Sequence, residues 1–257
     1  MRAARATHVR VCTLIAFVGC WAEAPLIVAA NRDERLSRAS SGPKAWKGEA
    51  FVAPRDEEAG GTWLGLHRDG LFVGVTNRAG TTRDPLLRSR GALVVEALRL
   101  RSARRVHEAF ASGALDGSAF NPFHLFYADL TGDAFVTWFD GSAVRRQPVS
   151  RGLFIVTERS LGGDDHGRTE RVRSTLDPLL SGGAAPRLEE IAPALRAHDE
   201  NDRIASTCIH VPELGYGTRS SLLLDVRPGL SGSRLLWAEG PPCTVPYVEV
   251  PLHPGDA

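Results

Sequence analysis

Two pairs of apolar, β-rich segments constrain the fold of this chain more than any other feature of its sequence. The first pair, CTLIAFV at 12–18 and PLIVAAN at 25–31, is separated by six residues. The second pair, GTWLGLHR and LFVGVTN, flanks Asp69-Gly70, a dipeptide favoured in type I′ turns. Short β-rich runs joined by short turns are typical of antiparallel hairpins. We therefore predict antiparallel sheet built from strands that are close in the sequence.

The rest of the chain supplies helices and further strands. Apolar residues recur near helical spacing over 86–112, and helices are also expected at 168–180 and 187–197. Strands are expected at 124–130, 134–140, 153–159, 220–226 and 234–240. Hairpins combined with segregated helices indicate an α+β fold, in which antiparallel sheets pack against helices. A length of 257 residues suits a single domain of moderate size.

The first 24 residues also admit a second interpretation, as a secretory signal. Residues 1–10 are basic, residues 11–21 are mostly apolar, and Ala22-Glu23-Ala24 has the form of a cleavage site. Cleavage there would remove the first strand of the hairpin and leave its partner with an unpaired edge. The pattern favours the hairpin, and with it a cytoplasmic protein; a true signal would make the protein secreted.

Composition and charge exclude several classes of partner. The formal net charge is +1, so no overall positive field attracts nucleic acid or an anionic membrane. No apolar run reaches the roughly 18–20 residues of a membrane span. The four cysteines lack CxxC spacing, so we predict no metal site, no cofactor and a reducing compartment. The excess of Arg over Lys, with much Ala and Gly, indicates a GC-rich bacterial genome.

The register of the first hairpin places a thiol beside a charged motif. If the six intervening residues form the loop, Cys12 lies across from Asn31, with Arg32 and Asp33 just beyond the strand end. An adjacent Arg lowers the pKa of a thiol and raises its thiolate fraction, so this set would suit a nucleophile. The competing interpretations are a buried cysteine on an apolar strand and a turn that carries a surface ion pair.

Other polar groups give weaker signals. A two-residue turn at 69–70 places Asn77 across from Thr62, where its amide either donates to a developing oxyanion or caps a turn. Asp164-Asp165-His166 lies in a Gly-rich segment without a second ligand pair, which is typical of a solvated loop. Cys208-Ile209-His210 is an i, i+2 pair whose simpler interpretation is a core cysteine beside an unrelated histidine.

Five short blocks of sequence follow one another in a specific order. Cys12-Thr13 and the AANRDE segment at 29–34 belong to the first hairpin, and GGTWLG at 60–65 and Thr76-Asn77 belong to the second. GYGTR at 215–219 precedes an apolar strand. Together these blocks resemble the NRDE proteins, the Transport and Golgi organisation family. The resemblance covers residue 12 to about 226, and we expect one domain over 12–250.

The resemblance implies an αββα sandwich, as in the N-terminal nucleophile (Ntn) hydrolases of the penicillin V acylase and bile salt hydrolase group. In those enzymes Cys is the first residue of the mature chain, and its α-amine is the general base. Carried over, Cys12 would be the nucleophile, Arg32 and Asp33 its partners, Asn77 an oxyanion donor and Arg219 a second cationic wall. The implied activity is hydrolysis of a small linear amide or acyl compound without an added cofactor.

Two departures from those acylases matter. Residues 1–11 precede Cys12 and have no counterpart in the family; we interpret them as a mis-annotated or disordered extension, with translation starting at Val11 from a GTG codon. The stretch 155–159 carries Glu158 where the acylases have Asn, and no role is assigned to it. The alternative hypotheses are a non-catalytic protein that binds or traffics haem or lipid, and a stand-alone domain. The sequence does not indicate which oligomeric state the protein adopts.

Overall fold

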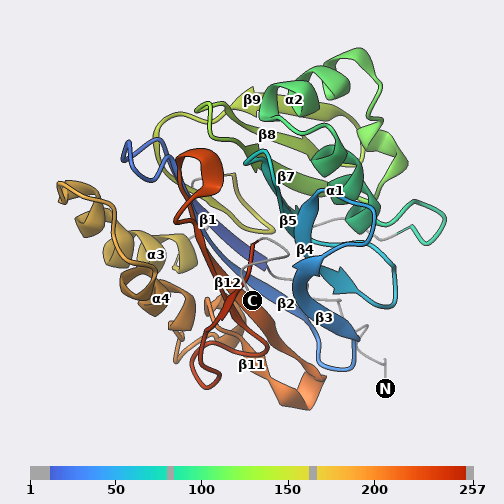
Figure 1. Ribbon diagram of the computed structural model, residues 1–257. Helices are drawn as coiled ribbons and strands as arrows, with labels where there is room; N and C mark the ends of the chain where they lie inside the picture. Colours follow the sequence, from blue (N-terminus) through green and yellow to red (C-terminus); the bar gives the residue numbers. More distant parts are fainter. Residues whose placement is uncertain (1–11, 80–83, 162–166, 253–257) are drawn as a thin grey trace, which may run out of the picture.

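Two antiparallel sheets pack face to face, and helices cover both outer faces (Figure 1). The computed structural model describes residues 12–79, 84–161 and 167–252. Residues 1–11 and the Asp164-Asp165-His166 segment lie outside the described residues. The predicted α+β class and αββα sandwich are confirmed.

The sheets each contain seven strands within the described residues. The first sheet runs in the order β10 (Gly152–Val156), β1 (Cys12–Val18), β2 (Leu26–Arg35), β12 (Tyr216–Val226), β13 (Arg234–Ala238) and β14 (Val248–Val250), with β11 (His210–Val211) also paired to β12. The second runs β3 (Ser40–Ala45), β4 (Phe51–Asp56), β5 (Leu64–His67), β6 (Phe72–Asn77), β7 (Phe123–Ala128), β8 (Ala134–Phe139) and β9 (Val144–Pro148).

Each sheet has its own helical layer. Helices α3 (Arg168–Leu176) and α4 (Leu188–Arg196) pack on the first sheet, and α1 (Arg90–Arg99) and α2 (Ala103–Ser112) pack on the second (Figure 1). Short 3₁₀ turns lie at Gly117–Ala119, Asp177–Ser181, Arg203–Ala205, Pro212–Leu214 and Pro228–Leu230.

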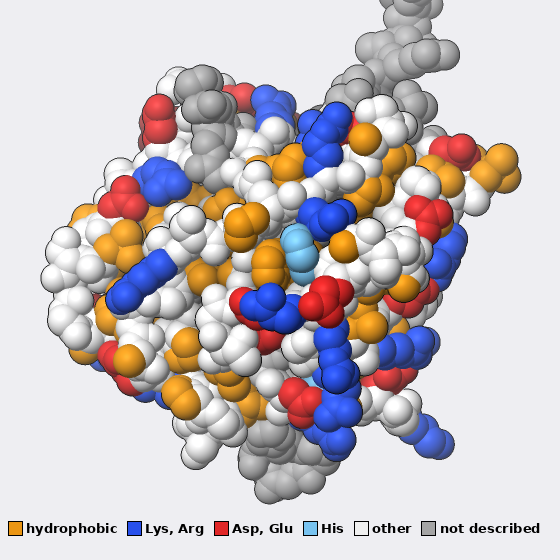
Figure 2. All heavy atoms as spheres, turned by 90° about the horizontal axis from the view of Figure 1, so that it is seen from above, with side chains coloured by type: hydrophobic (Ala, Val, Ile, Leu, Met, Phe, Trp, Pro, Cys, Tyr) orange, Lys and Arg blue, Asp and Glu red, His pale blue; other side chains and the backbone are white. Residues whose placement is uncertain are grey.

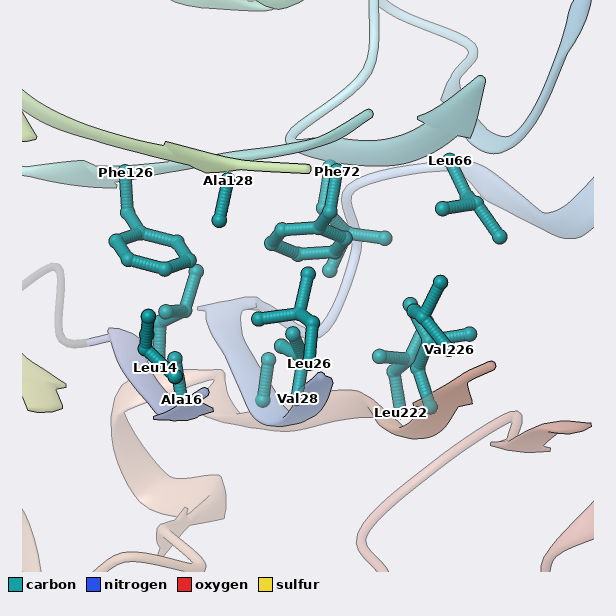
Figure 3. Close-up of a cluster of buried hydrophobic side chains, with 14 of the residues drawn as sticks. Leu14, Ala16, Leu26, Val28, Leu66, Phe72, Phe126, Ala128, Leu222 and Val226 are labelled. Atoms are coloured by element: carbon teal, nitrogen blue, oxygen red, sulfur yellow. The ribbon is translucent and has the colours of Figure 1, made fainter. Parts of the chain in front are cut away.

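The strand period of two separates the core into layers. In β1, Leu14 and Ala16 point to the core between the sheets, whereas Ile15 and Phe17 point to the core under α3 and α4. Figure 3 shows the first sheet meeting Phe72, Phe126 and other side chains of the second sheet. This packing brings the ends of β1 and β6 together, which matters for the site described below.

The first hairpin is shifted by one residue from the predicted register. Cys12 pairs with Arg32 rather than with Asn31, and Val18 pairs with Leu26. Pro25 has no N–H to donate, so at this end of the ladder it can only accept a hydrogen bond. Gly19, at φ +62°, donates its N–H to the Pro25 carbonyl at 2.8 Å and closes the loop. Strand β2 also extends to Arg35, so the charged motif lies within the strand rather than beyond it.

The second hairpin has a three-residue loop instead of the predicted two-residue turn. The His67 N–H donates to the Leu71 carbonyl at 2.8 Å, and Gly70 adopts φ +90°, which corresponds to a turn followed by a left-handed residue. The register therefore shifts by one, with Leu66 paired to Phe72. Asn77 lies across from Phe123 of β7 rather than from Thr62.

The single helical run predicted over 86–112 is wrong. It forms two helices, because the chain breaks at 100–102, where Arg101 adopts φ +71°. Ser102 then caps α2 by accepting a hydrogen bond from the Arg105 N–H. The other predicted helices and strands form within a few residues of their expected positions, but β3, β4, β9, β11 and β14 were not predicted.

The N-terminal segment behaves as the hairpin interpretation requires. Strand β1 lies between β10 and β2, so removal of the chain through Ala24 would delete an interior strand of the first sheet. Among the described residues, no helix is long and apolar enough to cross a membrane. The face in Figure 2 carries basic and acidic side chains close to one another, with hydrophobic side chains between them, in keeping with the small net charge.

Candidate active site

A cavity of about 310 Å³ lies at the edge where the two sheets meet. It brings together four of the five predicted site residues: Cys12, Arg32, Asp33 and Asn77. The first three come from β1 and β2 of the first sheet, and Asn77 comes from the end of β6 in the second sheet. Its other lining residues, among those described, are Glu34, Arg38, Asp56, Ala59, Thr62, Trp63, Val75, Leu87, Arg88, Ser89, Arg90, Gly91 and Asn121.

Strand β2 divides its polar side chains between two faces. The Arg32 guanidinium contacts residues of the second sheet, whereas the Asn31 amide donates to the carbonyls of Leu195 and Thr207 at 2.9 and 2.8 Å, in the helical layer. Asn31 therefore fastens β2 to the end of α4. Because neighbouring residues of a strand point to opposite faces, one short motif serves both the cavity and the layer behind it.

The Arg32 side chain is held from three sides. Its guanidinium donates to Ser40 Oγ at 3.2 Å and to Asp56 Oδ2 at 3.4 Å, and it lies 4.1 Å from the centre of the Trp63 ring. A planar guanidinium suits both contacts, because it forms ion pairs at its edge and stacks with its face. Trp63 belongs to the GGTWLG block, which the sequence reasoning recognised without giving the tryptophan a role.

Asp56 organises the charged wall of the cavity. Its Oδ2 accepts from Arg38 Nε at 2.8 Å as well as from Arg32, and its Oδ1 accepts from the backbone N–H groups of Glu58 and Ala59. Sequence reasoning missed both Asp56 and Arg38. The only local signal was Asp56 at the start of the turn that precedes the GGTWLG block.

The Cys12 thiol is not activated in the way the sequence suggested. Burial raises the pKa of Cys12 to about 12, and the Asp33 carboxylate adds to the rise, while the lowering effect of Arg32 is too small to offset them. The Cys12 sulfur also lies 3.9 Å from the Asp33 carbonyl oxygen. At neutral pH the group is therefore a thiol, and it needs a base before it can attack.

Asp33 is buried and incompletely hydrogen-bonded. Burial raises the pKa of Asp33 to about 7, although the hydrogen bond from Thr218 and the charge of Arg168 lower it. Thr218 Oγ1 donates to Asp33 Oδ1 at 2.5 Å, whereas Oδ2 has no hydrogen-bond partner within the described residues. A buried carboxylate oxygen without a hydrogen bond costs free energy, so Oδ2 is placed to accept a hydrogen bond from a group in the cavity.

Arg219 is not one of the described residues that line the cavity. It is the extra residue of a β-bulge in β12, where the pairing with β2 shifts between Thr218 and Ser220. Its guanidinium donates to the Arg38 carbonyl at 3.4 Å. Arg38, rather than Arg219, lies beside Arg32 on the cavity wall, where both bind Asp56 Oδ2.

Glu158 is a buried partner of Arg168. The two side chains form an ion pair at 3.0 Å, with exposed fractions of 4% and 5%. Arg168 also donates to the Ile204 carbonyl at 2.6 Å, and Arg159 lies 3.4 Å from the other Glu158 oxygen. The carboxylate of Glu158 is therefore committed to charge pairing in the layer behind the cavity.

The start of α1 completes the cavity. Ser89 caps the helix by accepting from the Gly91 N–H, and Arg88 and Arg90 flank it. The helix start lies against the GGTWLG block, where the Thr62 N–H donates to the Gly91 carbonyl at 3.3 Å. A Cβ on Gly61 would lie 2.5 Å from the Gly91 carbonyl carbon, so this contact requires glycine. Helix α1 was predicted, but its contact with the cavity was not.

Comparison with known proteins identifies relatives along most of the chain. Residues 12–229 match the profile of the family described as Transport and Golgi organisation 2. The chain is 26% identical to the Bos taurus Transport and Golgi organization protein 2 homolog over 231 residues, which cover 78% of this chain and 82% of that protein. It is 30% identical to the Mus musculus homolog over 129 residues, but that match spans only 46% of the mouse protein.

Solved structures share the fold at low sequence identity. Two variants of conjugated bile acid hydrolase from Clostridium perfringens superimpose with TM-scores of 0.59 and 0.60 at 12% identity. Each match covers 93% of this chain and 92% of the hydrolase. The fold is therefore Ntn-hydrolase-like, as the sequence blocks implied.

Proposed function

This chain belongs to the Transport and Golgi organisation 2 family, and we propose that it is an Ntn-type amidohydrolase with Cys12 as its nucleophile. One observation carries the proposal: a single cavity brings Cys12 together with Arg32, Asp33 and Asn77, which come from both sheets of an Ntn-hydrolase-like sandwich. The thiol supplies the nucleophile, and the remaining groups match the needs of acyl transfer.

The proposed base is the α-amine of Cys12, in a chain of which Cys12 is the first residue. With a thiol pKa of about 12, attack requires proton removal, and an α-amine of pKa about 7.7–8.0 is suited to that task at neutral pH. Asp33 Oδ2 supports this assignment, because it is buried without a partner among the described residues and would accept an N–H from the amine.

The reaction then proceeds through a thioester. The Cys12 sulfur attacks the amide carbonyl carbon while the α-amine takes the thiol proton. The Asn77 amide donates to the developing oxyanion. Breakage of the C–N bond releases the amine, which takes the proton, and leaves the acyl group on sulfur. Water attacks the thioester, releases the carboxylic acid and restores the thiol.

The charges of the cavity point to an anionic substrate. Four arginines line it against three acidic residues; Asp56 is paired with Arg32 and Arg38, and Arg88 is paired with Glu96 of α1. Arg88 and Arg90 flank the start of α1, where the backbone dipole also favours a negative group. We propose an acyl compound whose amide nitrogen bears a substituent with a carboxylate, as in an N-acyl amino acid.

The test uses a chain whose first residue is Cys12, released from a cleavable N-terminal fusion. We expect it to release the amino acid from N-acyl amino acids, including glycine-conjugated bile acids, with the amine product quantified by mass spectrometry. The matched chain that retains residues 1–11 lacks the free α-amine and should be slower by about 10²- to 10⁴-fold. Cys12→Ala in the Cys12-first chain should abolish turnover.

The second candidate function is ligand binding without turnover, for which haem and lipid are the ligand classes to test. Glu158 favours it, because a carboxylate paired with Arg168 stands where the related acylases carry an amide. A Cys12-first chain that binds an N-acyl amino acid in calorimetry but never releases its amine would support this candidate. That result would contradict the amidohydrolase.

A further inference from the structure

Two cysteines and two histidines converge outside the cavity, where the sequence predicted no metal. His198, Cys208, His210 and Cys243 each place one ligand atom within 4.8 Å of the others. The chain contains four cysteines and eight histidines, and two of each meet here from three separate segments. None of the four is among the described lining residues of the cavity.

The distances within this Cys₂His₂ cluster fit tetrahedral coordination. The Cys208 sulfur lies 3.6 Å from the Cys243 sulfur and 3.6 Å from His210 Nε2, and His210 Nε2 lies 3.1 Å from the Cys243 sulfur. A tetrahedral zinc ion with Zn–S near 2.3 Å and Zn–N near 2.0–2.1 Å separates its ligand atoms by roughly 3.3–3.8 Å. Two of the three separations fall in this range and the third is 0.2 Å shorter, while His198 lies within 4.8 Å of the other three ligand atoms, so a small movement of its side chain would complete the set.

The backbone holds the cluster in place. Cys208 lies at a bend and His210 begins β11 two residues later, and this short segment holds the Cys208 sulfur 3.6 Å from His210 Nε2. The N–H groups of Thr207 and Cys208 both donate to the Ala197 carbonyl, which brings His198 beside Cys208. Cys243 lies in a turn closed by the Val245 N–H, which donates to the Pro241 carbonyl.

We propose that the Cys₂His₂ cluster binds one Zn²⁺ ion as a structural site. Two thiolates and two imidazoles are a ligand set that favours zinc, and four protein ligands leave no open position for catalysis. His198 is exposed while Cys208 is buried, so an ion can enter from the solvent side and reach the inner sulfur. The ion would join the end of α4, β11 and the segment after β13 (Figure 1).

The proposed zinc site is connected to the cavity by two hydrogen bonds. The N–H of Ile209, between the two inner ligands, donates to Thr218 Oγ1 at 2.8 Å. Thr218 Oγ1 in turn donates to Asp33 Oδ1 at 2.5 Å. Zinc would therefore stabilise the segment that positions Asp33, and this role does not depend on whether the protein is an enzyme.

The experiment measures metal in the untagged full chain purified from zinc-supplemented cells. We expect elemental mass spectrometry to give one zinc per chain. After exchange with Co²⁺, we expect the strong visible absorption of a tetrahedral thiolate site. Cys243→Ser should weaken zinc binding by more than about 100-fold, because even losing a group that only orients a ligand costs 10- to 100-fold. His198→Ala, at an exposed position, provides a second variant if Cys243→Ser does not fold.

Cys20→Ser is the matched control. Cys20 is a half-buried free cysteine whose sulfur lies 3.7 Å from the Val18 carbonyl oxygen, outside the cluster, so this variant should bind zinc like the wild type. Zinc well below one per chain, with no visible cobalt absorption, would overturn the proposal. So would a Cys208–Cys243 disulfide in the isolated protein, or wild-type affinity in both Cys243→Ser and His198→Ala.

Discussion

At the scale of single residues, burial decides the chemistry of the charged motif more than charge pairing does. Arg32 lies next to Cys12, yet burial keeps the thiol pKa at about 12. Asp33 follows Arg32 directly in β2 and also lines the cavity, but its carboxylate is hydrogen-bonded to Thr218 and is affected by the charges of Arg168 and Glu158. Burial raises the pKa of Asp33 to about 7, well above the ordinary value of 3.8.

The raised pKa of Asp33 predicts a specific pH dependence of stability. Between about pH 4 and 7 the folded protein retains a proton on Asp33 that the unfolded chain has lost. The stabilisation from this group is therefore complete below about pH 4 and is lost as the pH rises through 7. In urea titrations, the free energy of unfolding of the wild type minus that of Asp33→Asn should fall from pH 5 to pH 8.

The control for this measurement is Asp116→Asn. Asp116 is exposed, and its hydrogen bonds with Ser118 lower its pKa below 3.8, so it is ionised in both states above pH 5 and the wild-type minus Asp116→Asn difference should stay constant from pH 5 to pH 8. A wild-type minus Asp33→Asn difference that stays constant from pH 5 to pH 8 would show that Asp33 is ionised throughout.

At the scale of elements, the approach of α1 to the GGTWLG block shapes one wall of the cavity. Gly61 and Gly91 let two backbones meet, and both neighbouring segments line the cavity. The sequence pattern predicted the helix and the hairpin separately, because each depends on its own periodicity. Their contact depends on two small residues thirty positions apart, for which periodicity gives no signal.

Gly61→Ala tests this contact. The new methyl group would lie 2.5 Å from the Gly91 backbone, which cannot move as a flexible side chain does. We expect a loss of about 1–3 kcal/mol in the free energy of unfolding. Gly183→Ala is the matched control, because nothing lies within 4 Å of its added Cβ, and it should change stability by less than about 0.5 kcal/mol. Equal stability of the two variants in urea would contradict the close contact.

At the scale of the whole molecule, the core between the sheets decides whether the site exists. Cys12 belongs to one sheet and Asn77 to the other, so their meeting depends on how the sheets pack. Phe72 and Phe126 fill this core with ring centres 6.3 Å apart, and Leu14 from the first sheet packs in the same cluster (Figure 3). Loss of this packing would separate the two halves of the cavity.

Phe72→Ala should therefore be strongly destabilising. Phe72 is fully buried, and removing a buried Phe side chain costs about 3–5 kcal/mol from lost transfer energy and the cavity left behind. Thermal and urea unfolding measure the change. Leu86→Ala removes a side chain that is 92% exposed and should leave the midpoint unchanged. A loss below about 1 kcal/mol for Phe72→Ala would contradict the proposed role of the inter-sheet core.

The sequence by itself determined the family, the α+β class, the two hairpins and four residues of the cavity, because these follow from short-range periodicity and from ordered motifs. The structure corrected the register of both hairpins by one residue, at the short turns that contain Pro25 and Gly70. Tertiary packing decided which residues of the two sheets meet at the cavity. It also decided the pKa values, since burial is set by layers that pack from distant segments. The same reason applies to the Cys₂His₂ cluster, whose ligands meet only when the chain has folded.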